Sequence, residues 1–274
     1  MPLNSVNTNV GALVALQNLN ATNTELNQVQ SRINTGKKVS SAKDNGAVWA
    51  IAQNQRGESA ALNAVKDSLQ RGQSAVDVAL SAGETISDLL LQMKEKALAA
   101  SDATLDTASR TALNTEFKSL RDQIAKVAAN ADFNGANLIK QGGTTVMALA
   151  NSTGTSKITV AAQALSLTGL SISSTAAFST AANAASQLTV INAAIAGSSA
   201  KIAQLGTGSK ALESAFAFTA KLQDTIDAGV GNLVDADLAK ESARLQALQT
   251  KQQLGIQALS IANASSSSLL GLFR

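Results

Sequence analysis

The chain has 274 residues, with no Cys, no His, no Tyr and a single Pro at position 2. Without Cys and His it lacks a disulfide framework, a thiolate nucleophile, a triad base and the usual zinc ligands. We therefore expect no enzyme, no cofactor and no metal site. The net charge of +3 includes no dense Lys/Arg block, so nucleic acid is not an expected partner.

No apolar run approaches the roughly 20 residues that cross a bilayer, so no membrane partner is expected. The N-terminus lacks the basic and apolar regions of a cleavable signal peptide. Taken alone, this indicates a cytoplasmic protein, unless export uses a route without such a signal.

The lack of Pro after residue 2 permits very long helices. Leu3, Val6, Val10 and Leu13 begin a heptad seam, which slips before Leu16, Leu19, Leu26 and Ile33. The first helix is predicted to stop at 34–36, because Gly36 suits a left-handed C-terminal cap. Ser41-x-x-Asp44 has the spacing of a capping box, which predicts the start of the next long helix.

From Leu62 to Ala97, apolar or small residues recur in alternating steps of three and four without a slip. The same pattern returns over 113–127, 188–216 and 238–269. Ser101-Asp102 interrupts the pattern that follows Leu62–Ala97. Asp132-Phe133-Asn134-Gly135 is a turn signal that ends the third helix. These periods predict a mainly α fold, a long antiparallel helical rod or coiled coil whose N- and C-termini are paired.

The period changes between about 140 and 180. Residues 144–149 and 157–160 alternate as strands do, and they flank the polar segment 151–156. This pattern predicts a small β-hairpin insertion followed by Ser/Thr-rich loops, with the helices before and after it packing against each other.

The two terminal seams are weak, because several of their positions hold polar or small residues: Asn23, Gln30, Glu241, Gln252, Gly255 and Ser266. An isolated pair of such helices buries too little to offset its ordering entropy. We therefore predict that the termini fold on assembly with other copies; the alternative is an ordinary frayed end of an intramolecular bundle.

Three short motifs resemble catalytic or phosphate-binding patterns. Ser40-x-x-Lys43 and Ser198-x-x-Lys201 have Ser–Lys nucleophile spacing, but the partner motifs are missing. Residues 206–210 lack the spacing of a phosphate loop and are interpreted as a helix irregularity. The sequence supports no catalytic site.

Residues 6–13 and 32–45 together resemble the N-terminal signature of bacterial flagellins. Residues 132–139 resemble their Phe-Asn-Gly segment, and 234–241 with 269–274 resemble their C-terminal signature. The resemblance covers roughly 1–140 and 185–274 in the family's order. The signature positions are Arg32, Gly36, Ser41, Asp44, Phe133, Asn134, Gly135, Asp235, Asp237 and Glu241.

The resemblance implies a structural subunit that polymerises into the flagellar filament for motility. Residues 1–40 with 235–274 would form the inner coiled-coil tube, and 41–140 with 180–234 the outer tube. Residues 141–179 would supply the hairpin and surface loops, without larger outer domains. The implied polymerisation seam consists of Val6, Val10, Leu13, Leu16, Leu19, Leu26, Ile33, Leu238, Leu245, Leu248, Leu259 and Leu269.

The implied partners are many copies of the chain itself or paralogous flagellins, and the hook–filament junction and filament-cap proteins. Export would use a flagellar chaperone and the type III apparatus, and would end in the secreted, extracellular filament. The rival interpretations are a hook–filament junction protein and a helical secreted effector or adhesin. The complete Phe-Asn-Gly segment and the Arg-Ile-Asn-Thr-Gly run favour flagellin.

One stretch departs from the family pattern. Flagellins sensed by the vertebrate innate receptor carry Leu-Gln-Arg-x-Arg-Glu-Leu, whereas residues 90–96 read Leu-Leu-Gln-Met-Lys-Glu-Lys. Gln92 holds the first Arg position and Lys96 the final Leu position. We therefore expect weak or absent receptor activation.

Overall fold

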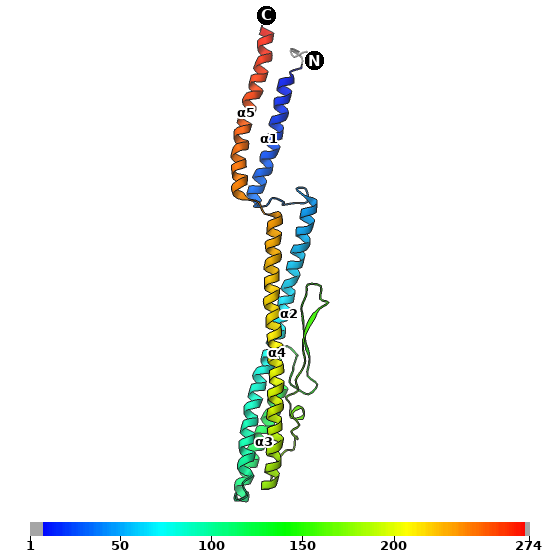
Figure 1. Ribbon diagram of the computed structural model, residues 1–274, viewed down its shortest axis with the longest axis vertical. Coiled ribbons are helices and arrows are strands. Elements are labelled where there is room, and N and C mark those ends of the chain that lie inside the picture. The colour runs from blue at the N-terminus through cyan, green and yellow to red at the C-terminus, as the bar shows by residue number, and fades with distance from the viewer. Residues whose placement is uncertain (1–7, 272–274) are drawn as a thin grey trace. The chain divides into compact units, whose positions relative to one another are not determined.

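The computed structural model describes the backbone of residues 8–271 and the side chains of residues 8–264. The described part is built mainly from long helices with one two-stranded antiparallel hairpin (Figure 1), which confirms the predicted fold class. In chain order the elements are α1 (Val10–Thr35), α2 (Gly46–Ala100), α3 (Thr107–Asn130), β1 (Val146–Leu149), β2 (Lys157–Val160), the 3-10 helix η1 (Thr168–Leu170), α4 (Ala181–Val234) and α5 (Leu238–Gly271).

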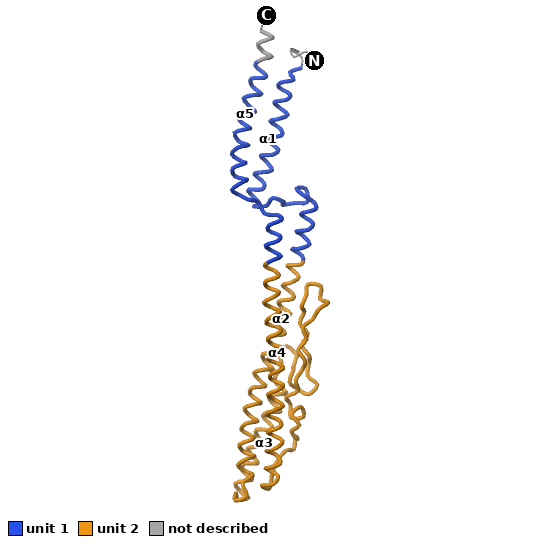
Figure 2. The backbone as a smooth tube through the Cα atoms, viewed as in Figure 1, with its two compact units in different colours: residues 1–57, 225–274 blue, residues 58–224 orange. Residues whose placement is uncertain are grey.

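The chain divides into two compact units (Figure 2). One comprises residues 1–57 and 225–274, and the other residues 58–224. Helices α2 and α4, with 55 and 54 residues, contribute to both units. At about 1.5 Å per residue, each helix is about 80 Å long, which the lack of Pro allows.

The core of the 58–224 unit follows the predicted heptads. Along α2, the seam from Leu62 to Ala97 is buried throughout, including the glycines at 72 and 83. The residues that face it from α3 and α4 are equally buried: Phe117, Leu120, Ile124, Ile191, Leu205 and Leu212. Phe117 also meets Phe178 edge to face, with ring centroids 5.1 Å apart.

Arg110 closes the connection between α2 and α3. Its guanidinium is buried and donates to the carbonyl oxygens of Ala100, Asp102 and Leu105. Three carbonyls at and just beyond the end of α2 are thereby satisfied. Asp106 caps the N-terminus of α3, because its side chain accepts from the Ser109 amide.

The β1–β2 hairpin packs on glycines of two helices. Its register pairs Val146 with Val160 and Leu149 with Lys157. An added Cβ at Gly208 of α4 would lie 2.6 Å from Val160 Cγ1, and one at Gly72 of α2 would lie 3.2 Å from Val146 Cγ1. The predicted helix irregularity at 206–210 is wrong, since α4 runs through it unbroken. Glycine at 208 permits close packing of the hairpin.

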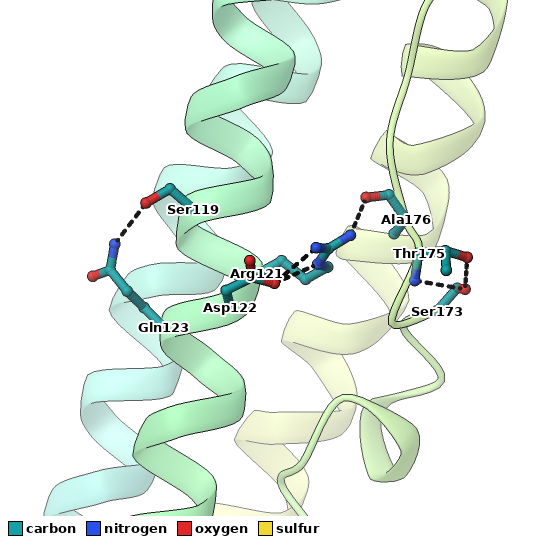
Figure 3. Close-up of polar contacts among 7 residues, drawn as sticks. All are labelled: Ser119, Arg121, Asp122, Gln123, Ser173, Thr175 and Ala176. Atoms are coloured by element: carbon teal, nitrogen blue, oxygen red, sulfur yellow. Dashed lines mark hydrogen bonds and ion pairs between the residues drawn. The ribbon is translucent and has the colours of Figure 1, made fainter.

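The Ser/Thr-rich segment after the hairpin is fixed to α3 and α4. Arg121 Nη1 donates to the Ala176 carbonyl at 2.9 Å, and its other nitrogens contact Asp122 (Figure 3). From α4, Lys201 Nζ donates to the carbonyl oxygens of Ala164 and Gly169. Lys201 of the Ser–Lys match therefore has a structural role in holding this segment.

In the unit formed by 1–57 and 225–274, α1 ends where predicted, with Gly36 in the left-handed conformation at φ 66°. The predicted helix start at the Ser41–Asp44 box is wrong, because α2 begins only at Gly46. Asp44 Oδ2 accepts from the amides and hydroxyls of Ser40 and Ser41 and closes a separate turn. Asn45 caps α2 instead, accepting from the Val48 amide.

Candidate assembly surface

Helices α1 and α5 form an antiparallel pair in the unit that contains both termini (Figure 1). Its apolar core is a small cluster of Leu26, Val29 and Leu248, with Ile33 and Leu245 packed against it. Leu26 and Leu248 are thus buried within one chain, while Ile33 and Leu245 are half-buried. This cluster lies in the half of the pair that adjoins the junction with α2 and α4.

The seam of α1 differs from the one that the sequence predicts. Buried or half-buried residues recur at Ala12, Ala15, Leu19, Thr22, Leu26, Val29 and Ile33, in alternating steps of three and four without a slip, and Asn23 and Arg32 are half-buried beside them. The predicted slip arises because Val10, Leu13 and Leu16 do not belong to this seam. Small residues line the pair towards the chain termini, and Leu259 and Gly255 of α5 are half-buried opposite them.

Polar contacts join α1 and α5 at several levels. Near the junction, Arg32 Nη1 lies 3.1 Å from Glu241 Oε1, and Glu241 is 9% exposed. At mid-length, Gln252 Nε2 donates to Asn23 Oδ1 at 2.7 Å. Towards the termini, Asn9 Nδ2 donates to the Ala262 carbonyl at 2.7 Å. The seam is therefore partly polar along its described length.

Large apolar side chains lie on the faces of the pair turned away from the seam. Val10, Leu13 and Val14 share one face of α1, at positions i, i+3 and i+4, and are 51–57% exposed. Leu16 is also exposed. On α5, Leu254 and Ile261 lie seven residues apart on one face and are 59% and 71% exposed. Exposed apolar stripes of this kind are typical of surfaces that contact another protein.

Two grooves between α1 and α5 adjoin these side chains. One is lined by Asn9, Ala12, Leu13, Leu16 and Leu259. The other is lined by Leu19, Thr22, Leu254, Gly255 and Ala258. Both grooves therefore lie beside exposed apolar side chains, with Ala12 in one and Gly255 and Ala258 in the other.

The predicted seam does not include Val14, Leu254, Ile256 and Ile261, which are all at least half exposed. These residues fall outside the alternating seam. The seven-residue spacing of Leu254 and Ile261 marks a second apolar stripe on α5, a signal that the sequence does contain. Leu238, a predicted seam residue at the first position of α5, is 49% exposed.

Several signature residues build the junction that positions this pair. Lys37 and Asp235 form an antiparallel bridge, the amides of Lys38 and Val39 donate to the Val234 carbonyl, and the Ala236 amide donates to the Gly36 carbonyl. Asp237 caps α5 by accepting from the amides of Ala239 and Lys240. The signature therefore encodes the backbone path between the helices.

Phe133, Asn134 and Gly135 lie in the other unit and form a tight turn. Phe133 and Ala136 exchange backbone hydrogen bonds, and Asn134 and Gly135 have φ values of 51° and 82°. Both central residues are left-handed, which Asn and Gly tolerate best. Asp132 Oδ1 accepts from the Gly135 amide and closes the turn.

Gln92 and Lys96 also lie in the 58–224 unit, on the outside of α2. Gln92 is exposed, whereas Lys96 Nζ lies 2.9 Å from Glu116 Oε2 of α3. Glu116 raises the pKa of Lys96 above its ordinary value. Their neighbours Leu90 and Met93 are buried, so the described structure presents Leu91, Gln92, Lys94 and Glu95 on this face.

Of the predicted seam residues, Val6 lies outside the described residues and Leu269 outside the described side chains. Within the described part of the chain, no helix is both long and apolar enough to cross a membrane.

Comparison with known proteins identifies the family. The bacterial flagellin N-terminal helical region matches residues 6–144, and the bacterial flagellin C-terminal helical region matches residues 188–273. The chain is 62% identical over 274 residues to flagellins FljM and FljK of Caulobacter vibrioides, covering the whole of each chain. It is 39% identical to a flagellin of Brucella melitensis, covering 98% of this chain and 99% of that one.

Among solved structures, the fold is similar to that of a protein described as flagellar hook-associated from Vibrio parahaemolyticus. The TM-score is 0.57 at 14% identity, covering 70% of this chain and all of that one. This likeness concerns the fold alone. The two family matches and the full-length relatives show that the chain belongs to the bacterial flagellin family, the structural subunits of the flagellar filament.

Proposed function

We propose that copies of this flagellin polymerise through the outward faces of the α1–α5 pair. The observation that supports this proposal is the exposure of Val10, Leu13, Val14, Leu254 and Ile261. Fully burying one such side chain contributes about 1.5–3 kcal/mol. Several burials per contact, repeated between many copies, supply a driving force that a single chain lacks.

The predicted polymerisation seam then has two roles. Leu26, Leu248 and their half-buried neighbours hold α1 to α5 within one subunit. Val10, Leu13 and Leu16 face outward and join one subunit to the next. In this proposal 1–40 with 235–274 form the inner tube of the filament, and 41–140 with 180–234 form the outer tube. Residues 141–179 supply the hairpin and surface loops.

The terminal pair is proposed to complete its folding on assembly. Its buried apolar cluster is small, and its seam towards the termini consists mainly of small, half-buried residues. An isolated pair therefore recovers little hydrophobic free energy against its ordering entropy. Contact with neighbouring copies covers the outward faces and shifts that balance.

The partners proposed for this assembly are copies of the chain and paralogous flagellins. Caulobacter vibrioides has several flagellins, including FljM, FljK and FljO, that are 61–62% identical to this chain. Their number supports the proposal that paralogues share a filament. Contacts with hook–filament junction and cap proteins, and export by a chaperone and the type III apparatus to the extracellular filament, belong to the same proposal.

The proposal is tested by seeding the purified protein with filament fragments and imaging it by electron microscopy. A flagellin extends the seeds into filaments, whereas a secreted effector or adhesin with stable termini stays monomeric. A junction protein would add to filament ends without elongating them. Failure to elongate seeds of its own sheared filaments would overturn the proposal.

A further inference from the structure

We propose that Asn23 and Gln252 are positioning residues that set the axial register of α1 against α5. This inference rests on the proposed function, because register matters through the outward faces that contact other copies. It is supported by an observation that the proposed function does not use: a side-chain hydrogen bond of 2.7 Å joins the two residues between the helices. Both residues are half-buried.

The need for a register signal comes from the seam on the terminal side of Asn23. Ala12, Ala15 and Leu19 of α1 meet Gly255 and Leu259 of α5 there, all half-buried. Leu19 packs over Gly255, but the other α1 residues here are alanines. This half therefore discriminates less strongly than a bulky seam between the native pairing and one shifted by a heptad. The apolar cluster of Leu26, Val29 and Leu248 and the Arg32–Glu241 ion pair lie on the junction side of Asn23. The Asn9–Ala262 hydrogen bond lies towards the termini, so the Asn23–Gln252 bond is the polar contact at mid-length.

A shift by one heptad would separate the two amides. In an antiparallel pair it would place Leu245 or Leu259 opposite Asn23, depending on its direction. A half-buried amide would then face an aliphatic side chain and lose its partner, which disfavours the shifted pairing. Gln252 is half-buried at the helix interface, and Asn23 lies beside the seam residue Thr22. Polar residues at such interfaces specify register in coiled coils in this way, at a cost in stability.

Register determines where the outward faces stand. A heptad of helix spans about 10.5 Å. A shifted pair would therefore displace Leu254 and Ile261 of α5 by that length relative to Val10 and Leu13 of α1. The two outward faces would then no longer be at the axial positions that contact neighbouring copies. The Asn23–Gln252 bond thereby links the folding of one subunit to the regularity of the polymer.

The chain contains no Cys, which allows a direct test by introduced disulfides. A Cβ built at Gly255 lies 3.9 Å from Leu19 Cβ, and one at Gly11 lies 3.9 Å from Ala262 Cβ, within disulfide range. The pairs Leu19→Cys/Gly255→Cys and Gly11→Cys/Ala262→Cys therefore report the native register. Leu19→Cys/Ala262→Cys and Gly11→Cys/Gly255→Cys report a one-heptad shift in either direction.

Each reporter is compared in the natural background and with Asn23→Leu/Gln252→Leu. The variants are added as a minor fraction to wild-type subunits growing on seeds, so that disulfides within a chain dominate, and are separated on non-reducing gels. Circular dichroism of the soluble protein checks that helix content is retained. The matched control is the exchange Asn23→Gln/Gln252→Asn, which keeps an amide pair.

We expect the native reporters alone to cross-link in the natural background and in the amide exchange. With both leucines, cross-linking of a shifted reporter should rise at least several-fold while helix content is retained. If the leucine variant is excluded from filaments, the soluble protein is assayed, and a shifted cross-link there supports the proposal. Native cross-linking alone, in filaments or in solution, would overturn it. Failure of wild-type subunits to elongate seeds would instead overturn the proposed function.

Discussion

Arg32 and Glu241 form an ion pair of 3.1 Å between α1 and α5, beside the junction where Gly36 pairs with Ala236. The side chains retain 22% and 11% exposure, and Glu241 Oε2 is buried without a hydrogen-bond partner in the described part of the chain. Removing Arg32 would leave the carboxylate buried with its charge uncompensated.

We therefore expect Arg32→Ala to destabilise the terminal pair by up to about 3 kcal/mol, the low end for a fully buried ion pair, because the Arg32 side chain is partly exposed. Hydrogen exchange of amides in α1 and α5 measures the loss. Arg32→Lys is the matched control, because it keeps the charge while losing the guanidinium geometry, and its loss should be smaller. Equal protection in Arg32→Ala and the wild type would show that the ion pair contributes nothing.

The two roles assigned to apolar residues of the terminal pair predict different phenotypes. Leu248 is buried against Leu26 and Val29, so Leu248→Asp should unfold the pair and abolish filament formation. Leu13 is 57% exposed and lies outside the buried cluster of Leu26, Val29 and Leu248. In soluble protein, Leu13→Asp should therefore leave amide protection around that cluster close to wild type and still block elongation of seeds. In both variants, circular dichroism should show that the long helices of the 58–224 unit persist.

Hydrogen exchange combined with seeded growth separates the two variants. An exposed residue of the same helix, Gln17, provides the control, and Gln17→Asp should elongate seeds more readily than Leu13→Asp. Normal filaments from Leu13→Asp would show that the outward face of α1 is not a contact between copies.

How far the sequence predicts this structure depends on how much volume the seam residues have. Along α2, the bulky Leu62, Leu69 and Leu90 recur on one face, so the pattern predicts the buried seam that the structure contains. In α1, an Ala stripe at 12 and 15 competes with the bulkier residues at 10, 13 and 16. Only the presence of α5 decides between them.

The ends of helices and the turns also differ in how well the sequence predicts them. Gly36 and the Asn134-Gly135 turn depend on backbone conformations that few residues adopt, and their positions follow directly from the sequence. The start of α2 does not, because both Asp44 and Asn45 are competent caps. Asp44 is occupied by four hydrogen bonds from Ser40 and Ser41, which leaves Asn45 to begin the helix.

Glycine at 208 gives a prediction with a matched control two residues away. An added Cβ at Gly208 would lie 2.6 Å from Val160, whereas one at Gly206 meets nothing within 4 Å. Overpacking costs about 1–3 kcal/mol, and replacing Gly by Ala inside a helix gains about 1 kcal/mol. Gly206→Ala should therefore have a higher thermal midpoint than the wild type. The midpoint of Gly208→Ala should be lower than that of Gly206→Ala.

Thermal denaturation by circular dichroism measures both variants. Restoring space with Val160→Ala should recover part of the loss in Gly208→Ala, since the clash is with that side chain. A Gly208→Ala midpoint equal to that of Gly206→Ala would contradict the close packing of the hairpin on α4.

Acid should loosen the N-terminus of α3. Hydrogen bonds from the backbone amide and the side chain of Ser109 lower the pKa of Asp106 below 3.8. A carboxyl group with a lowered pKa in the folded state contributes stability that is present above its unfolded pKa. This stability is lost as the pH falls through the folded value. The affected range therefore begins near pH 3.8 and extends below it.

Asp106→Asn keeps a side-chain oxygen for the cap but removes the titration. We expect its thermal midpoint to fall less than that of the wild type between neutral pH and about pH 2. Asp106→Ala, which lacks the cap altogether, should be less stable than both at neutral pH. Parallel acid profiles for Asp106→Asn and the wild type would exclude Asp106 as a source of the loss.

Finally, the face of α2 that carries Gln92 and Lys96 predicts a weak response of the vertebrate innate receptor. Lys96 is tied to Glu116 at 2.9 Å, so a charged pair stands where flagellins sensed by this receptor have an aliphatic side chain. Gln92, which replaces a cation, is exposed. We expect Gln92→Arg/Lys96→Leu to raise signalling by purified monomer in a receptor-reporter cell assay.

The control is Glu116→Gln, which breaks the ion pair without restoring the pattern and should leave signalling low. Both variants should keep their helix content, because the salt bridge is partly exposed, at 29% for Lys96 and 57% for Glu116, and contributes little to stability. Strong signalling from the unmodified chain, or an equal rise in Glu116→Gln, would show that Gln92 and Lys96 do not determine the response.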